Sequence, residues 1–216
     1  MAIVLMQPTL ATPPRPYADA PTLPSGQEAV DVRALVRGEW IELEIGPGRG
    51  GFLFERARSA PAAGLVGFEV RRKWASVVDA RLAERGLGAR ARVFAEDARL
   101  ALARLTPDAS VRRVFVHFPD PWWKKRHRKR TVVQAGFVRE IVRLLQPGGE
   151  LFVQTDVASR ADAYEELLGS EKLLRAKGDD AGSARLSDNP YGAQSPRERR
   201  AQADGLPIYR LRYERY

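Results

Sequence analysis

Short apolar runs alternate with helical patterns from Trp40 onward, and this alternation restricts the fold more than any other feature. Short apolar runs bounded by turn residues are typical of buried strands. Five are expected as strands: WIELEI (40–45), GLVGFEV (64–70), ARVFAED (91–97), VRRVFVHF (111–118) and a run centred on Leu151, Phe152 and Val153. Strands that alternate with helices form parallel sheets with helices on both faces, so the sequence predicts an α/β, doubly wound fold.

The two ends of the chain have weaker patterns. Residues 1–27 contain six of the fifteen prolines and no apolar period, which predicts an extended, poorly ordered tail. Residues 28–216 have the length of a single domain. The segment from Ile208 to Tyr213 is expected as a last strand.

Composition excludes several classes of protein. No apolar run approaches the ~18 residues of a spanning helix, so no membrane partner is expected. The absence of cysteine excludes disulfides, thiol catalysis and Cys-ligated zinc, and two histidines leave no metal site to expect. His117 is interpreted as structural. The N-terminal MAIVLM lacks the basic start of a secretion signal, and a cytoplasmic protein is expected.

An acidic residue lies at the C-terminal end of each of the five expected strands. In a doubly wound sheet these ends share one edge, where ligands bind, so the carboxylates are expected to converge. They are Glu44, Glu69, Asp97, Asp120 and Asp156. Helix N-capping is the alternative role, for which Asp97 and Asp156 are well placed.

The first strand is followed by the glycine-rich turn GPGRGG at 46–51. Small residues let the backbone approach a ligand closely, so Gly46 and Gly48 are candidate binding positions. The turn also matches the G-x-G-x-x-G pattern of dinucleotide-binding proteins, with Glu69 near the position that binds a ribose. It therefore indicates an adenosine-containing ligand, and a nicotinamide or flavin dinucleotide stays open here, as does a purely structural turn.

The most specific segment is FPDPWW at 118–123, followed at once by KKRHRKR at 124–130. Prolines on both sides of Asp120 stiffen the turn that presents its carboxylate. Trp122 or Trp123 is placed to stack on a base, and the cations beyond are placed to bind phosphates. This run supplies six of the net charge of +9, a concentration that favours a polyanionic partner over a merely solvated loop.

These residues resemble the bacterial tRNA (guanine-N7-)-methyltransferases. The resemblance runs from about Ile41 to the C-terminus and is carried by LEIGPGRGGF (43–52), GFEV (67–70), FAEDA (94–98), FPDPWWKKRHRKR (118–130) and QPGGELFVQTD (146–156). It implies S-adenosyl-L-methionine as methyl donor, S-adenosyl-L-homocysteine as product, and N7 of a variable-loop guanine, guanine 46 of tRNA, as acceptor. It also implies a Rossmann-like, mostly parallel seven-strand sheet with an antiparallel last strand. A monomer or homodimer is expected.

Carried over position by position, the resemblance implies a role for each candidate residue, with Asp120 as the catalytic residue. The donor-binding positions are Glu44, Gly46, Gly48, Glu69, Asp97 and Asp120. The substrate-binding positions are Lys124, Asp156, Ser195, Pro196, Arg197 and Glu198. The basic tRNA patch consists of Lys125, Arg126, Arg128, Lys129 and Arg130.

One stretch departs from the family pattern. The family has Thr-x-aromatic-Glu near the C-terminus, whereas this chain has SPRE at 195–198. Arg197 is expected to replace the missing ring by stacking on a base or by pairing with a phosphate.

Three functions are compatible with the sequence. A tRNA N7-methyltransferase uses the glycine turn, the acids and the basic patch together. A dinucleotide-dependent oxidoreductase explains the glycines and Glu69 but leaves the basic patch without a role. A non-catalytic RNA-binding relative would keep the patch and lose the donor pocket.

Overall fold

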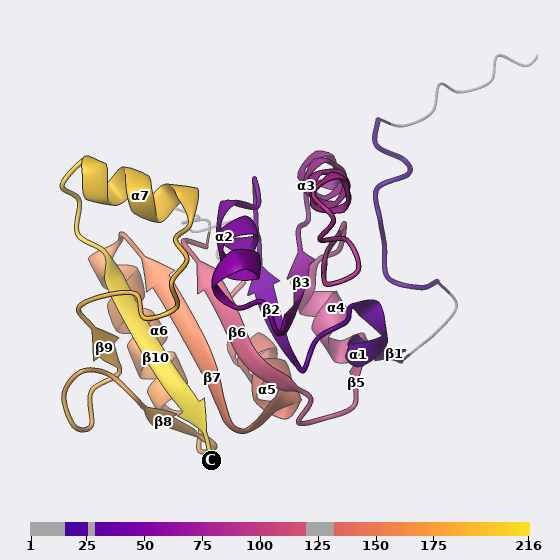
Figure 1. The fold of residues 1–216 in the computed structure, drawn as a ribbon. Helices are drawn as coiled ribbons and strands as arrows, with labels where there is room; N and C mark the ends of the chain where they lie inside the picture. Colours follow the sequence, from indigo (N-terminus) through magenta and orange to yellow (C-terminus); the bar gives the residue numbers. More distant parts are fainter. Residues whose placement is uncertain (1–15, 26–28, 120–131) are drawn as a thin grey trace, which may run out of the picture.

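The computed structural model describes residues 16–25, 29–119 and 132–216 as alternating strands and helices (Figure 1). The strands are β1 (Val30–Asp31), β2 (Trp40–Ile45), β3 (Ala63–Phe68), β4 (Ala91–Phe94), β5 (Leu105–Thr106), β6 (Val111–His117), β7 (Leu145–Thr155), β8 (Leu174–Ala176), β9 (Arg185–Leu186) and β10 (Tyr209–Arg215). The helices are α1 (Val32–Leu35), α2 (Gly51–Ser59), α3 (Arg72–Glu84), α4 (Ala98–Arg104), α5 (Ala135–Leu144), α6 (Ala158–Gly169) and α7 (Pro196–Ala203).

The main sheet has the strand order β4-β3-β2-β6-β7-β10-β8, and β9 also pairs with β10. The strands from β4 to β7 are parallel, and β10 runs antiparallel to β7, β8 and β9. The predicted α/β fold with an antiparallel last strand is therefore confirmed, with the two-residue β9 added beside the seven strands. The chain leaves β2 toward β3 and β4 and then crosses back to β6, so the order reverses between β2 and β6, which is where such sheets bind ligands.

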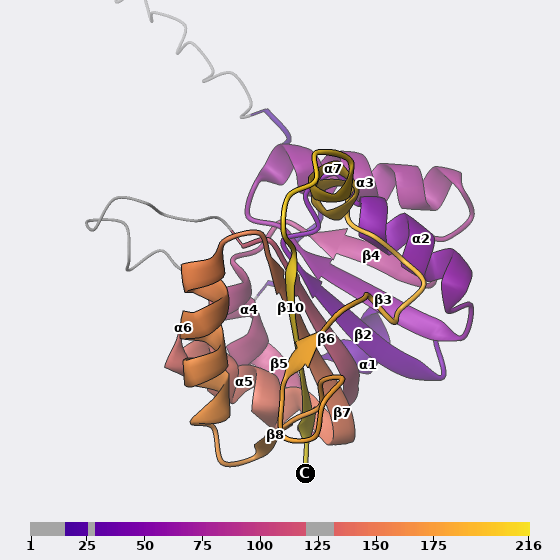
Figure 2. The same ribbon diagram turned by 90° about the vertical axis from the view of Figure 1, so that its left-hand side faces the viewer.

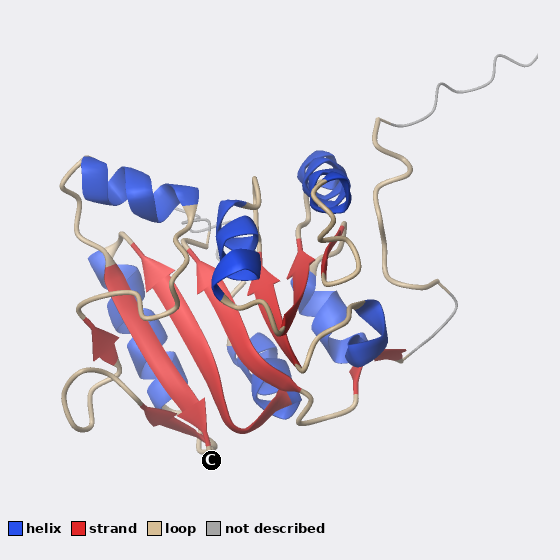
Figure 3. Cartoon of the chain, in the orientation of Figure 1, coloured by secondary structure: helices blue, strands red, loops and turns tan. Residues whose placement is uncertain are grey.

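Helices cover both faces of the sheet (Figures 2 and 3). Helices α4, α5 and α6 lie on one face, and α2 and α3 lie on the other (Figure 2). The central strands are buried on both sides, as expected for parallel strands; all six residues of β3 are buried. None of the helices in the described ranges is long and apolar enough to cross a membrane.

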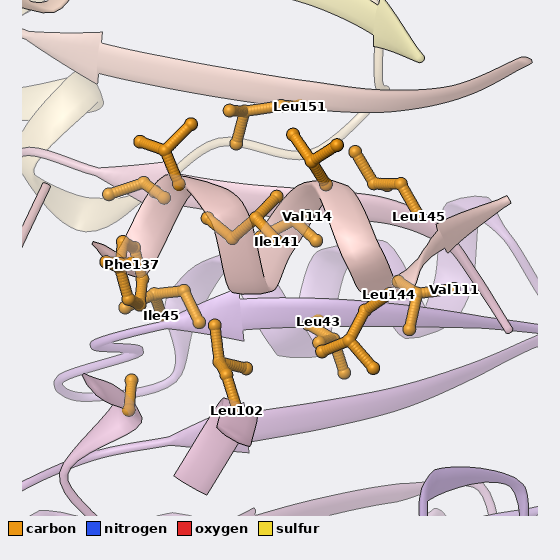
Figure 4. Packing of buried hydrophobic residues seen from close by; sticks show 14 of the residues in the cluster. Leu43, Ile45, Leu102, Val111, Val114, Phe137, Ile141, Leu144, Leu145 and Leu151 are labelled. Carbon is orange, nitrogen blue, oxygen red and sulfur yellow. The ribbon is translucent and has the colours of Figure 1, made fainter. Parts of the chain in front are cut away.

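Helix α5 shows how the apolar pattern builds the core. Phe137, Ile141 and Leu144 recur at helical spacing and pack with Leu43 and Ile45 of β2 (Figure 4). The helix ends at Leu144, and the PGG turn at 147–149 lies within β7 instead of in a loop. The register between β6 and β7 jumps there, from Val111 opposite Leu145 to Arg113 opposite Glu150, so the turn residues bulge out of the ladder.

Residues 16–25, expected as part of a poorly ordered tail, lie against the domain instead. The Ala95 amide donates to the Pro21 carbonyl at 2.6 Å, and the Leu23 amide donates to Glu96 Oε1 at 3.0 Å. Leu23 is buried in the main hydrophobic cluster. This segment therefore covers the edge of the sheet at the end of β4, and one apolar side chain among prolines is too weak a signal to predict that contact.

Candidate functional site

The glycine-rich turn joins the end of β2 to the start of α2. Gly46 has a φ of 71°, and a Cβ there would meet nothing within 4 Å, so its free side faces open space. Gly51 is constrained by packing, because a Cβ there would lie 2.5 Å from Cγ of Pro196 on α7. The turn therefore leaves room for a ligand at its first glycine and brings α7 close at its last.

Two adjoining cavities lie at the carboxyl edge of the described sheet, with volumes of about 340 and 540 Å³. They share Gly46, His117, Phe118 and Pro119 as a common wall. The acids Glu44 and Asp156 line the first cavity, whereas Glu69, Glu96 and Asp97 line the second. The expected convergence of strand-end acids at one edge is thus observed for the four that the structure describes.

Glu69 ties the glycine turn to the end of β3. Its Oε2 accepts from the Gly48 amide at 3.0 Å, and its Oε1 accepts from the Arg71 amide at 2.9 Å and from Arg71 Nε at 3.0 Å. Its Oε2 also accepts from an Arg71 guanidinium nitrogen at 3.4 Å, so each oxygen of Glu69 has two protein donors at the wall of the cavity that it lines.

Asp97 combines the cavity with the alternative capping role. It is the N-cap of α4, and its Oδ1 accepts from the Arg99 amide at 3.0 Å. Hydrogen bonds from the Arg99 side chain lower the pKa of Asp97 below its usual value. Asp156 does not cap a helix; the N-cap position of α6 is Val157, without a side-chain cap.

A buried pair of Glu44 and His117 lies at the shared wall: His117 lines both cavities, and Glu44 lines the first. Glu44 Oε1 lies 3.2 Å from His117 Nδ1, and both residues are less than one-tenth exposed. Among the described atoms, Glu44 Oε2 and His117 Nε2 are buried without a hydrogen-bond partner. Burial raises the pKa of Glu44, His117 opposes the shift, and the charge of Glu69 adds to it. The sequence analysis interpreted His117 as structural, whereas the structure places it in the lining of both cavities. Its position directly before the FPDP turn is the signal from which that placement could have been predicted.

The start of α7 closes the first cavity on its far side. Arg197 Nε donates to Asp156 Oδ2 at 2.9 Å, and Ser195, Pro196 and Arg197 all line this cavity. Ser195 is the N-cap of α7, and its Oγ accepts from the Glu198 amide at 3.1 Å. Pro196 occupies the first helical turn, where its missing N–H is harmless.

Glu198 lies away from the cavities. It is fully buried, and its carboxylate accepts from Gln154 Nε2 at 2.8 Å, from Asn189 Nδ2 at 3.0 Å and from an Arg210 guanidinium nitrogen at 3.1 Å. These contacts anchor α7 to β7 and β10. The family resemblance implies that Glu198 contacts the nucleotide. The geometry favours a different role, in which Glu198 holds helix α7 in place.

Several candidate residues fall outside the described ranges. They are Asp120, Lys124 and the basic patch of Lys125, Arg126, Arg128, Lys129 and Arg130. Pro119, the last described residue before them, lines both cavities. Within residues 16–25, 29–119 and 132–216, no group of three or more His, Asp or Glu side chains is arranged to hold a metal ion.

Comparison with known proteins places this geometry in a family. A family model described as "Putative methyltransferase" matches residues 39–211. A tRNA (guanine-N(7)-)-methyltransferase of Anaeromyxobacter dehalogenans is 41% identical over 176 residues, which cover 81% of this chain and 85% of the relative. The enzyme of that name from Myxococcus xanthus is 38% identical over 80% of this chain and 82% of the relative.

Solved structures agree on the fold. The 16S rRNA methyltransferase KamB superposes with a TM-score of 0.60 at 17% identity, covering 90% of this chain and 98% of that one. TrmN from Thermus thermophilus superposes with a TM-score of 0.57 at 18% identity, covering 86% and 47%. With its sequence matched over most of its length and its fold shared with methyltransferases, the chain belongs to the tRNA (guanine-N7-)-methyltransferase family.

Proposed function

We propose that this chain transfers a methyl group from S-adenosyl-L-methionine to N7 of guanine 46 in the variable loop of tRNA. The observation that carries the proposal is the pair of adjoining cavities at the carboxyl edge of the sheet, in a chain whose relatives are named tRNA (guanine-N(7)-)-methyltransferase. One cavity suits the methyl donor, and the other suits the acceptor base.

The residues of the second cavity fit the adenosine end of the donor. Glu69 lines this cavity, and its longest contact, 3.4 Å to an Arg71 guanidinium nitrogen, is the one that a ribose hydroxyl would replace. Asp97 is placed to accept from the adenine amino group. The open side of Gly46 gives a ligand access to the backbone at the common wall. The unpartnered oxygen of Glu44 suits the cationic amino-acid end of the donor.

The first cavity suits a guanine. Asp156 lines it and supplies acceptors for the N–H groups of the base edge, while Arg197 holds that carboxylate in place. Arg197 is about half exposed, so its guanidinium plane is also available to a base or phosphate. Ser195 and Pro196 fix the start of α7 beside this site.

The reaction requires orientation and charge stabilisation. When bound, S-adenosyl-L-methionine supplies a methyl group on a sulfonium and leaves as the thioether S-adenosyl-L-homocysteine. Guanine N7 is an open acceptor with an in-plane lone pair, so this chain needs no base to activate it. The protein residues must hold the base in line with the methyl group, which accounts for several kcal/mol of barrier. Asp120 carries the negative charge that stabilises the cation developing on the purine.

The alternatives fit less well. The glycine turn and Glu69 suit a dinucleotide equally, but the relatives are methyltransferases and the basic segment has no role in hydride transfer. A non-catalytic relative would have no need for a donor cavity lined by Glu69 and Asp97.

The direct test supplies labelled S-adenosyl-L-methionine and unmodified tRNA transcripts, and maps the product by chemical cleavage at 7-methylguanosine. We expect label at guanine 46 and none on a matched transcript with adenine there. Label at another guanine would contradict the position, and binding of NAD without S-adenosyl-L-methionine would contradict the reaction.

Asp120 has its own test. Asp120→Asn keeps the shape of the side chain and removes its charge, so turnover at saturating donor should fall by about 10²- to 10³-fold. If Asp120 only forms the turn, the variant keeps near wild-type turnover.

A further inference from the structure

The Glu44–His117 pair is unusual because it is buried at a cavity wall with unused hydrogen-bonding atoms on both members. Glu44 comes from β2 and His117 from β6, the two strands between which the sheet order reverses. Each has one polar atom bonded to the other and one without a partner among the described residues. Buried polar atoms left without partners are rare in folded proteins, so this arrangement requires an explanation.

Three apolar rings pack around the histidine. The Phe52 ring lies 4.2 Å from the imidazole, and Phe115 and Phe152 lie near 6 Å between centroids. None of these rings compensates a charge on the pair. Its charge is therefore sensitive to whatever enters the adjacent cavities.

Charged groups from several other parts of the chain line the two cavities beside the pair. In the first cavity they are Arg49 of the glycine turn, Asp156 after β7 and its partner Arg197 on α7; in the second they are Glu69 with its partner Arg71, Glu96, and Asp97 with its partner Arg99. Arg56 of α2 is held by Glu42 and is not available to the pair. Of these, Glu69 acts directly on Glu44, and its negative charge favours a protonated pair.

We propose that His117 is a positioning residue for the methyl donor: with Glu44 it forms a pair that holds an extra proton without donor and releases that proton when the donor's cationic amino-acid end binds. This inference rests on the proposed function, because it takes S-adenosyl-L-methionine as the ligand. The step moves one proton from the pair to solvent and changes no other bond.

Without donor, an ionised Glu44 buried next to Glu69 is costly, and one added proton makes the Glu44–His117 pair neutral. With the donor's adenosine end in the second cavity, its ammonium would come close to the shared wall, which His117 lines with Glu44 beside it in the first cavity. A cation there favours the state in which imidazole Nδ1–H donates to an ionised Glu44.

Calorimetry of donor binding to the full chain, without tRNA, tests the proposal. Binding is measured between pH 6 and 8 in buffers of different ionisation enthalpy, and the dependence of the observed heat on that enthalpy gives the protons released. We expect up to one proton released per S-adenosyl-L-methionine. S-adenosyl-L-homocysteine, which keeps the ammonium, should release a similar fraction, and 5′-methylthioadenosine, which lacks the amino-acid end, should release none.

Two variants separate the proton from the packing. Glu44→Gln removes the carboxyl that burial keeps protonated, so proton release should fall by at least half. His117→Phe fits among the rings but loses the hydrogen bond, so affinity should also fall about 10-fold or more. Glu140→Gln, which removes a carboxylate on α5 outside both cavities, is the matched control and should release protons as the wild type does. Thermal unfolding of each variant confirms that it is folded.

The outcomes distinguish this inference from the proposed function. If S-adenosyl-L-methionine binds with no proton release in the wild type, if Glu44→Gln releases as much as the wild type, or if His117→Phe binds the donor as tightly as the wild type, the inference is wrong and the methyltransferase proposal stands. If S-adenosyl-L-methionine does not bind at all, the proposed function itself fails.

Discussion

Glu42 and Glu44 lie two residues apart on β2 and point to the same face of the sheet, because side chains alternate along a strand. Both are buried. Glu42 accepts from Arg56 Nε at 2.7 Å, from an Arg113 guanidinium nitrogen at 2.9 Å and from Trp40 Nε1 at 3.0 Å. Glu44 has the single described partner His117, at 3.2 Å.

The pKa values of the two glutamates move in opposite directions. Burial alone would raise the pKa of Glu42, but hydrogen bonds and charge from Arg56, with further bonds from Trp40 and Arg113, outweigh it and lower that pKa. Burial raises the pKa of Glu44, because its one neighbour does not compensate. In the middle of β2, Glu42 is therefore fully paired with protein donors. At the end of β2, Glu44 keeps an oxygen without a described partner, which a ligand can use.

The largest expected effect is on stability and comes from the fully paired Glu42. Glu42→Gln leaves the buried guanidinium of Arg56 without its charged partner, so the free energy of unfolding should fall by about 3–5 kcal/mol. Urea unfolding measures the loss. Glu44→Gln is the matched control on the same strand, and an equal loss there would show that the two sites do not differ.

Glu44→Gln should affect binding instead of folding. A charge-assisted contact to the donor is lost, so donor affinity should fall by about 10- to 100-fold. Because the pKa of Glu44 is raised in the folded protein, the folded state holds this proton more tightly than the unfolded chain does. Its contribution to stability is therefore present at low pH and lost as pH rises through the raised pKa. As the pH rises through this pKa, Glu44→Gln should become more stable relative to the wild type. Calorimetry of donor binding checks the loss of affinity, and unfolding at several pH values checks the change in stability.

Arg197→Ala tests an exposed ion pair at the same edge. An ion pair of this exposure contributes at most about 1 kcal/mol to stability, so unfolding should change little. The Michaelis constant for tRNA should rise about fivefold to tenfold, because both the guanidinium and the fixed position of Asp156 are lost. Arg200→Ala, which removes an exposed arginine paired with Asp204 on the same helix, is the control. If both variants raise the Michaelis constant for tRNA equally, Arg197 contributes only general positive charge at the surface.

Asp97→Asn should have the smallest effect. Asparagine caps helices about as well as aspartate, so stability should stay within about 0.5 kcal/mol, whereas Asp97→Ala should cost about 1 kcal/mol. Donor affinity should fall only a few-fold in the asparagine variant, since its amide oxygen still accepts. A donor affinity unchanged even in Asp97→Ala would leave Asp97 as a cap alone.

The sequence predicted what depends on local pattern. WIELEI coincides with β2, and the apolar spacing through Phe137 and Ile141 marks α5, because burial imposes both periods. The acids at strand ends converge because parallel topology brings those ends together. Whether a buried acid is paired depends on partners far along the chain, as in the contacts of Glu42 with Arg113 and of Glu198 with Gln154. Those contacts follow from tertiary packing, which no local pattern contains.

The approach of Gly51 to Pro196 has a consequence for how the two ligands influence each other. The glycine turn and the start of α7 leave no room between them there for even one methyl group. A ligand that shifts the turn therefore presses on α7. Coupling free energies are reciprocal, so if bound donor tightens the binding of tRNA through this contact, bound tRNA tightens the binding of donor by the same factor. Gly51→Ala would change that shared factor, so a substitution at a single glycine would tune how strongly the two ligands affect each other.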